Sequence, residues 1–123
     1  MVLVLPPTAR AGSSELEWSG LIGLAKRYWM HAGAPEFPDI VRVMIEPCDI
    51  ACMWMEGDLC YVWLGPEAYR DRRHVAIAAH EVGHCLGLDH VDRPGYSGVM
   101  RGVLEDMSDP DDDVRLCRRS VAC

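Results

Sequence analysis

The segment HEVGHCLGLDH, residues 80–90, constrains the fold more than any other part of the chain. Its histidines stand at positions i, i+4 and i+10, with a glutamate directly after the first and a glycine between the second and third. Residues four apart lie on one side of a helix, so His80 and His84 can present their imidazoles to one metal ion. Gly87 can end that helix in a left-handed conformation and turn the chain, which brings His90 back toward the metal.

The same segment predicts a chemistry. Three histidine ligands leave one position of a tetrahedral zinc ion open to water, which is typical of catalytic and not of structural zinc sites. Such water can ionise near neutral pH and attack a carbonyl carbon. Glu81 is predicted to be the general base that takes the water's proton and passes it to the leaving amine. We therefore expect one catalytic Zn2+ ion held by His80, His84 and His90, and hydrolysis of peptide bonds.

The composition limits the number of domains and the kinds of partner that we expect. The chain has 123 residues, half of them hydrophobic, which predicts a single domain over residues 1–123. A formal net charge of −7, without any Lys/Arg-rich run, argues against a nucleic-acid partner. No apolar run approaches the length that crosses a membrane, so we expect no membrane partner. The expected state is a monomer whose partner is a peptide or protein substrate.

The N-terminal segment MVLVLPPTARAG resembles a signal peptide only in the cleavage-like spacing of Ala9, Arg10 and Ala11. It has no charged n-region, and its apolar part, residues 2–5, is too short for an h-region. We therefore predict no signal peptide in the chain, and either a cytoplasmic location or release by another route.

Six cysteines in so short a chain suit a secreted disulfide protein, whereas the N-terminus gives no export signal. Cys85 lies inside the helical motif and is expected to be a small buried residue with a free thiol. Five cysteines then remain, so at least one further thiol is expected to be free. Cys52 and Cys60 are equidistant from Glu56 in a predicted hairpin, which favours a cross-strand disulfide between them.

Three segments have the patterns of helices. Ser14 and Glu17 form a capping-box pattern, and apolar residues then recur at helical spacing as far as Gly33, which predicts a helix of about 18 residues. Asp71 is predicted to cap a second helix, which carries the histidines. The acidic and then basic run at residues 108–121 predicts a short C-terminal helix whose aspartates cap its positive end and do not bind calcium.

Strand-like runs follow the first helix at residues 39–47, 49–56 and 58–65, and residues 2–5 are a candidate for a further strand. The last two long runs are joined by a tight turn at Glu56-Gly57-Asp58. The run at 58–65 immediately precedes the loop into the histidine helix, so it is predicted to be the edge strand that pairs with substrate. These elements together predict an α+β fold.

The histidine segment matches H-E-x-x-H-x-x-G-x-x-H at all five defining positions, and so resembles the zinc signature of the metzincin metallopeptidases. Within that group the chain is most similar to a minimal matrixin catalytic domain. The segment has the matrixin form H-E-x-G-H-x-L-G-L-x-H, and MSDPDDDVRL resembles the acidic opening of the final matrixin helix. Met100, in YSGVM, stands at a suitable distance for the methionine turn of this family. The specific match covers residues 72–116.

The resemblance implies a zincin-like fold: a small twisted mixed sheet, a long N-terminal helix, a zinc-binding active-site helix and a short C-terminal helix. It also implies a zinc metalloendopeptidase that cleaves extended peptides lying along an edge strand. Two alternatives stay open. One is a zinc-bearing peptide-binding module without turnover, which the presence of Glu81 argues against, and the other is an amidase that acts on cell-wall peptides.

Three features depart from the matrixin pattern. Arg101 and Gly102 follow the methionine where matrixins have Tyr-Pro, so the wall of the S1′ pocket is not carried over. The tyrosine two positions after the methionine in astacin-like and serralysin-like members is missing too, and Tyr96 is not assigned that role. The chain also lacks the matrixin pro-segment with its inhibitory cysteine and the histidines of a second, structural zinc site.

Overall fold

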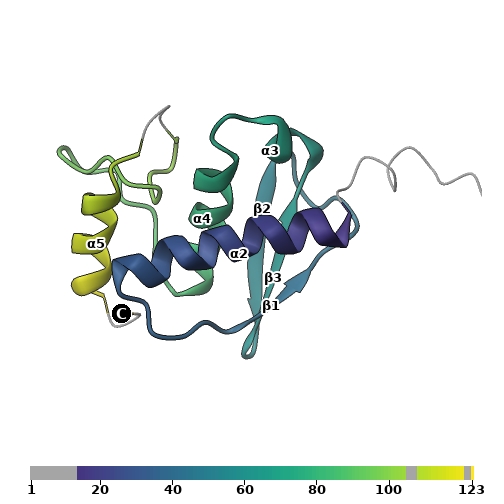
Figure 1. Cartoon of the computed structure of the whole chain (residues 1–123), viewed down its shortest axis with the longest axis horizontal. Coiled ribbons are helices and arrows are strands. Elements are labelled where there is room, and N and C mark those ends of the chain that lie inside the picture. The colour runs from purple at the N-terminus through teal and green to yellow at the C-terminus, as the bar shows by residue number, and fades with distance from the viewer. Residues whose placement is uncertain (1–13, 105–107, 121–122) are drawn as a thin grey trace, which may run out of the picture.

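The computed structural model describes residues 14–104, 108–120 and 123, and they form a small α+β fold with four helices and a three-stranded mixed sheet. In chain order the elements are α2 (Glu15–Ala32), β1 (Asp39–Arg42), β2 (Ala51–Glu56), β3 (Leu59–Leu64), α3 (Pro66–Arg70), α4 (His74–Cys85) and α5 (Pro110–Arg118). The long helix α2 lies across α4 and the sheet, and α5 stands at one end of the molecule (Figure 1). No helix of the described ranges is long and apolar enough to span a membrane.

Helix α2 has the predicted length of 18 residues, because both of its predicted ends are present. The Ser14 hydroxyl accepts from the backbone N–H of Glu17 at 3.1 Å, and the Glu17 carboxylate accepts from that of Ser14 at 3.2 Å. At the other end Gly33 has a φ of 120°, which a residue with a side chain rarely adopts. The buried stripe of the helix packs against α4 and α5 and consists of Trp18, Leu21, Ile22, Ala25, Trp29 and Ala32.

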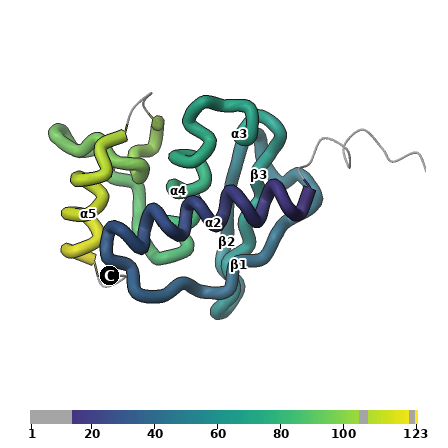
Figure 2. Tube along the Cα trace, in the orientation of Figure 1, coloured from purple at the N-terminus to yellow at the C-terminus, as the bar shows by residue number. Residues whose placement is uncertain are grey.

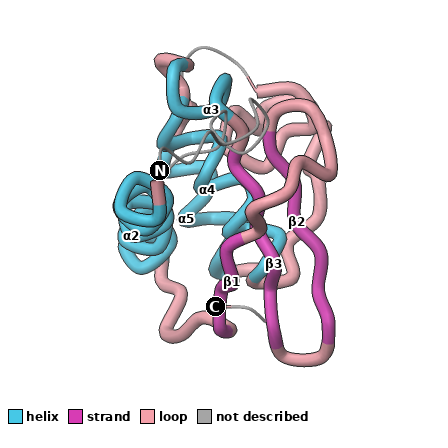
Figure 3. Tube along the Cα trace, turned by 90° about the vertical axis from the view of Figure 1, so that its right-hand side faces the viewer, coloured by secondary structure: helices cyan, strands magenta, loops and turns pink. Residues whose placement is uncertain are grey.

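The sheet has the order β1-β3-β2, with β1 parallel and β2 antiparallel to β3. Figure 3 shows the three strands on one side of the molecule and the helices on the other. The hairpin turn predicted between β2 and β3 is present, with Gly57 at a φ of 60°. All three strands are shorter than their predicted runs, and the candidate strand at residues 2–5 lies outside the described residues.

The prediction that residues 58–65 form the edge strand was wrong. Strand β3 is central because it pairs with β2 on one side and with β1, in parallel, on the other. Strands β1 and β3 are not consecutive in the sequence. Strand β2 therefore lies at an edge of the sheet. Proximity along the chain to the histidine helix did not indicate position in the sheet.

The predicted start of the histidine helix was also wrong. A short helix that was not predicted, α3, comes first, and Asp71 ends it. Helix α4 then begins at His74, with Arg73 at its N-cap position. The Asp71 carboxylate accepts hydrogen bonds from the backbone N–H of Arg73 at 2.8 Å and from its Nε at 3.0 Å. Asp71 thus stabilises the connection between the two helices.

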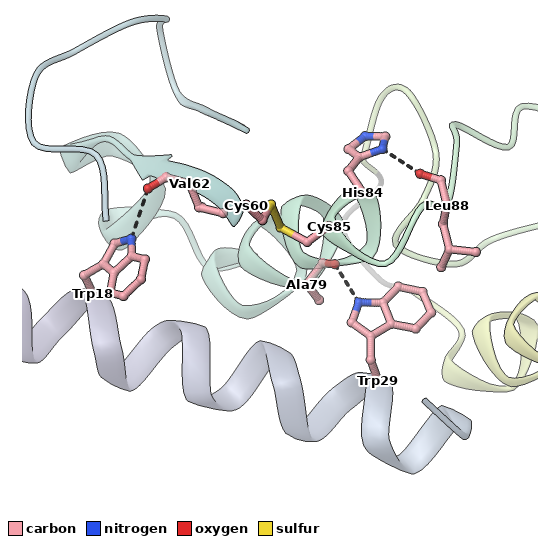
Figure 4. Close-up of a disulfide and its surroundings, with 8 residues drawn as sticks. All are labelled: Trp18, Trp29, Cys60, Val62, Ala79, His84, Cys85 and Leu88. Carbon is pink, nitrogen blue, oxygen red and sulfur yellow. Dashed lines mark hydrogen bonds between the residues drawn. A yellow bond between two sulfur atoms is a disulfide. The ribbon is translucent and has the colours of Figure 1, made fainter. Parts of the chain in front are cut away.

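All six cysteines are paired, as Cys48–Cys52, Cys60–Cys85 and Cys117–Cys123. The predicted bridge between Cys52 and Cys60 was wrong because the hairpin turn is centred after Glu56, so Cys60 lies opposite Met55 and Cys52 opposite Trp63. The expectation of two free thiols was wrong as well. Cys85, in the last turn of α4, faces the fully buried Cys60 and joins the helix to the central strand (Figure 4).

The C-terminal helix α5 forms as predicted. Asp109 is its N-cap, and the Asp109 carboxylate accepts from the backbone N–H of Asp111 at 2.9 Å. The helix packs against the C-terminal part of α2, beside the segment that follows α4 (Figure 2). Its Asp113 is fully buried, which simple capping does not explain.

Candidate metal centre

The structure brings the three predicted ligands together. His80 and His84 come from successive turns of α4, and His90 comes from the segment after the helix. The Nε2 atom of His80 lies 3.1 Å from Nε2 of His84 and 3.1 Å from Nε2 of His90. The three candidate ligand atoms all lie within 4.8 Å of one another. Zinc–nitrogen bonds of about 2.0–2.1 Å in a tetrahedral site place ligand nitrogens roughly 3.3 Å apart, so the separation suits one ion.

The hydrogen bonds of the Nδ1 atoms fix the tautomers of the two helical histidines. Nδ1 of His80 lies 2.6 Å from the Val99 carbonyl oxygen, and Nδ1 of His84 lies 2.7 Å from that of Leu88 (Figure 4). A carbonyl oxygen only accepts, so Nδ1 carries the hydrogen and the Nε2 lone pair is left for a metal. Two Nε2 lone pairs that face each other at 3.1 Å repel, and a cation between them removes that repulsion.

Burial keeps the imidazoles of His80 and His84 neutral, as metal binding requires. It lowers the pKa of His80 to about 4, and it also lowers the pKa of His84. His90 is the exposed member of the three. Its segment is held against the chain after Met100, because the Val91 N–H donates to the Met100 carbonyl at 2.8 Å and the Gly102 N–H donates to Asp92 at 2.9 Å.

Gly87 lies at the turn that brings the third ligand back. Its φ is 96°, in the left-handed region that favours glycine. Two hydrogen bonds close the turn: Gly87 N–H donates to the His84 carbonyl at 2.9 Å, and Leu88 N–H donates to the Gly83 carbonyl at 3.0 Å. The same turn directs the Leu88 carbonyl at His84, so it also orients the second ligand.

Met100 is fully buried against the ligand helix. A Cβ atom at Gly83, the residue before the second ligand, would collide with Met100 Sδ and would lie 2.9 Å from the Trp29 ring. The Trp29 indole donates to the Ala79 carbonyl at 2.7 Å on the same helix (Figure 4). Close packing under α4 therefore depends on glycine at 83 and a thioether at 100.

A buried carboxylate that was not predicted holds the segment beneath the ligands. Asp113 accepts from the hydroxyl of Tyr28, from that of Tyr96 at 2.5 Å and from the Val99 N–H at 3.0 Å. The Tyr96 hydroxyl in turn accepts from the Met100 N–H at 3.0 Å. Because the Val99 carbonyl orients His80, the network connects α2 and α5 to the first ligand.

Burial changes the pKa values of the acidic groups in this network. Burial raises the pKa of the Asp113 carboxyl, and the three hydrogen bonds it accepts oppose that shift. Burial and the hydrogen bonds to Asp113 raise the pKa of Tyr28 and of Tyr96 above the ordinary range. The only signal of this role in the sequence is helical periodicity, which turns one of the aspartates at 111–113 toward the core.

Glu81 lies in the cleft beside the ligands and is 8% exposed. Burial raises the pKa of its carboxyl to about 7. Glu81 and His80 line two cavities. One, of about 450 Å3, also borders His84, His90 and strand β2, and the other has a volume of about 310 Å3. The second is lined further by Ile50, Ala51, Asp71, Arg73, Ile77 and the segment 101–104. Arg101 and Gly102, which depart from the matrixin pattern, thus border the cleft.

Comparison of the chain with protein-family models, with curated proteins and with solved structures finds no match. The class of site therefore follows from the arrangement of its own residues. That arrangement is a group of three histidines that could hold one metal ion, with a buried glutamate in the adjoining cleft.

Proposed function

We propose that this chain is a zinc-dependent endopeptidase of the metzincin group, with a zincin-like fold close to a minimal matrixin catalytic domain. The observation that carries the proposal is the convergence of three imidazole Nε2 atoms beside the buried Glu81. The order of long helix, mixed sheet, ligand helix and short terminal helix supports it. So does the fully buried Met100 beneath the ligand helix.

The donor set suits zinc. Neutral imidazoles bind zinc readily, and all six cysteines are in disulfides, so no thiolate completes a closed structural site. Three protein ligands leave a position for a reacting molecule. A zinc ion held by the three histidines would supply Lewis acidity toward a peptide carbonyl and toward water.

Glu81 moves the proton. As water adds to the peptide carbonyl carbon, the Glu81 carboxylate takes a proton from the water, and it gives that proton to the amine nitrogen as the carbon–nitrogen bond breaks. Its position next to His80 in the chain, and its place in the lining of both cavities, support this role. A peptide-binding module would have no use for a carboxylate buried at this point.

In this proposal, strand β2 has the role of pairing with substrate that was predicted for residues 58–65. It is an edge strand, and Ala51, Cys52 and Met53 line the cavity that borders all three ligands. An extended substrate can add to such an edge through backbone hydrogen bonds, while its side chains enter the neighbouring cavities. The substrate in this proposal is thus a peptide segment in extended conformation.

Three disulfides in one short chain favour action in an oxidising compartment. Of the two locations considered from the sequence, we therefore propose the released form over the cytoplasmic one.

The test is hydrolysis of casein by the purified chain, with and without a zinc chelator, beside Glu81→Ala and the matched surface control Glu67→Ala. We expect one zinc per chain in all three proteins and cleavage that chelation abolishes. Glu81→Ala should lose at least about 100-fold in rate, the usual contribution of a general base, whereas Glu67→Ala should match the wild type.

Other outcomes separate the alternatives. Zinc at one per chain without cleavage of any peptide substrate would favour the binding module. Cleavage confined to cell-wall peptides would favour the amidase. A chain that does not retain zinc would contradict the proposal as a whole.

A further inference from the structure

A small cavity is lined by residues of helix α5 and of the segment that follows His90, and it shares no lining residue with the two cavities beside Glu81. Its volume is about 150 Å3, below the range of pockets that enclose whole small molecules. Its lining residues are Arg93, Pro94, Gly95, Tyr96, Asp112, Arg115 and Arg119. Three arginines from two different parts of the chain therefore line one small space, together with a single acidic residue.

The carboxylate is already engaged. One oxygen of Asp112 accepts from the guanidinium of Arg115, and the other accepts from the Ser97 N–H at 2.7 Å. Neither Arg93 nor Arg119 forms an ion pair with a carboxylate of the described residues. The lining thus carries an excess of two positive charges in a chain whose net charge is −7.

Helix electrostatics accounts for only part of this cluster. Arg119 is the C-cap of α5, where a positive charge interacts favourably with the helix dipole. Asp109 and Asp111 act on Arg115 through space, but they do not line the cavity. Arg93 comes from the loop opposite the helix and interacts through space with Asp112, so one carboxylate faces three arginines. Convergence of like charges is unfavourable unless an anion lies between them.

We propose that this cavity binds an oxyanion of the size of phosphate or sulfate, held by Arg93, Arg115 and Arg119. Guanidinium groups present planar pairs of N–H donors that match the oxygens of such anions. The cavity accommodates one anionic group, either a free ion or the head group of a phosphomonoester whose remainder lies in solvent.

A bound anion would stabilise one side of the metal site. Arg93 lies three residues beyond His90, and Tyr96, in the same segment, donates to the buried Asp113. An anion between this segment and α5 would join the two elements by charged hydrogen bonds. The proposal needs no peptidase activity, so its outcome is separate from that of the proposed function.

The test is thermal denaturation of the zinc-loaded full chain in rising inorganic phosphate or sulfate, with sodium chloride at matched ionic strength as reference. We expect a saturable rise in Tm, about 3 °C or more at ten times the Kd. Arg93→Ser and Arg119→Ser should lose most of that rise. Arg27→Ser, which removes an exposed arginine of α2 outside the cavity, should keep it.

Phenyl phosphate distinguishes the two sources of the anion. A rise in Tm equal to that with inorganic phosphate would support the site and assign it to a phosphate group on a larger molecule. A response to inorganic ions alone would support the cavity as a site for a free ion. Broadening of the phosphorus NMR line, lost in Arg93→Ser, provides a second readout at constant temperature. An equal rise in chloride, or an unchanged rise in both cavity variants, would overturn the proposal.

Discussion

The two sides of the metal cleft are built differently. Beneath the ligands lie the fully buried Met100 and Asp113, and the carboxylate of Asp113 accepts three hydrogen bonds from separate parts of the chain. On the open side, Ile50 and Val103 line the cavity beside Glu81 and are 47% and 80% exposed. The comparison teaches that the positions of the three histidines depend on a few specific buried partners, whereas we expect the exposed residues of the cleft to be replaceable with little effect on those positions.

The change expected to have the largest effect removes the buried carboxylate. Asp113→Ala leaves the Tyr28 and Tyr96 hydroxyls and the Val99 N–H without their acceptor, and should lower the free energy of unfolding by about 4 kcal/mol. Urea denaturation measures this loss. Asp111→Ala, at an exposed position of the same helix, is the matched control and should change stability little. Equal losses in the two variants would contradict the special role of Asp113.

The second change removes the covalent link between the central strand and the histidine helix. The Cys60–Cys85 disulfide closes a loop with a sequence separation of 25 and joins β3 to α4, whereas Cys48–Cys52 has a separation of 4. Replacing the first pair by alanine should cost about 3.5 kcal/mol, and replacing the second about 2 kcal/mol, because a longer loop gains more chain entropy when released. Unfolding in urea gives both values, and thiol titration of the single variants checks the pairing. A greater loss for the short loop would contradict the expectation.

The third change tests packing under the ligand helix. Gly83→Ala places a methyl group against Met100 and Trp29 and should lower stability by about 1–3 kcal/mol. Gly23→Ala, inside α2 with nothing within 4 Å of the added atom, should instead raise stability by about 0.5–1 kcal/mol. The difference in Tm between the two variants is the measurement. A stabilising Gly83→Ala would show that the packing beneath α4 is loose.

The fourth test is alkaline pH. Burial raises the pKa of Tyr28 and Tyr96, so the folded state holds both phenol protons more tightly than the unfolded state does. Stability is therefore unaffected below the unfolded pKa of about 10 and falls as the pH rises above it, by no more than about 1 kcal/mol for each tyrosine at pH 10.5. Urea denaturation at pH 8 and pH 10.5 measures the fall. Tyr28→Phe should lose less stability over this interval than the wild type, and an identical loss would argue against the assignment.

The smallest effect on stability is expected on the open side. Val103→Ser changes an 80% exposed side chain and should alter the free energy of unfolding by less than about 0.5 kcal/mol. Because Val103 lines the cavity beside Glu81, the same variant should raise KM for peptide substrates while its zinc content stays unchanged. Stability and KM measured on one preparation decide the point. A large loss of stability would remove the contrast between the two sides.

Features encoded by neighbouring residues could be predicted from the sequence. The capping box of Ser14 and Glu17 and the end of the helix at Gly33 are local hydrogen-bonding and backbone preferences, and they fixed α2 to its full length. The spacing of His80 and His84 likewise placed both imidazoles on one side of a helix. In each case the physical cause lies within a few residues of the feature.

Features that depend on distant parts of the chain could not be predicted. The sequence contains no sign that Cys85 meets Cys60, because this depends on how α4 packs against the central strand. The parallel pairing of β1 with β3 skips the strand between them and has no local signature. Asp113 looked like one of several capping aspartates, and only its partners on α2 and beneath the ligands distinguish it.

The contact between Gly83 and Met100 has a consequence for evolution. The thioether occupies the space that any side chain at 83 would need, so the two positions share one fixed volume. A lineage that gains a side chain at 83 must shorten the one at 100 at nearly the same time, since each step alone passes through a clash or a void. In related sequences the two positions should change together or not at all, and their covariation would record the packing distance beneath the ligand helix.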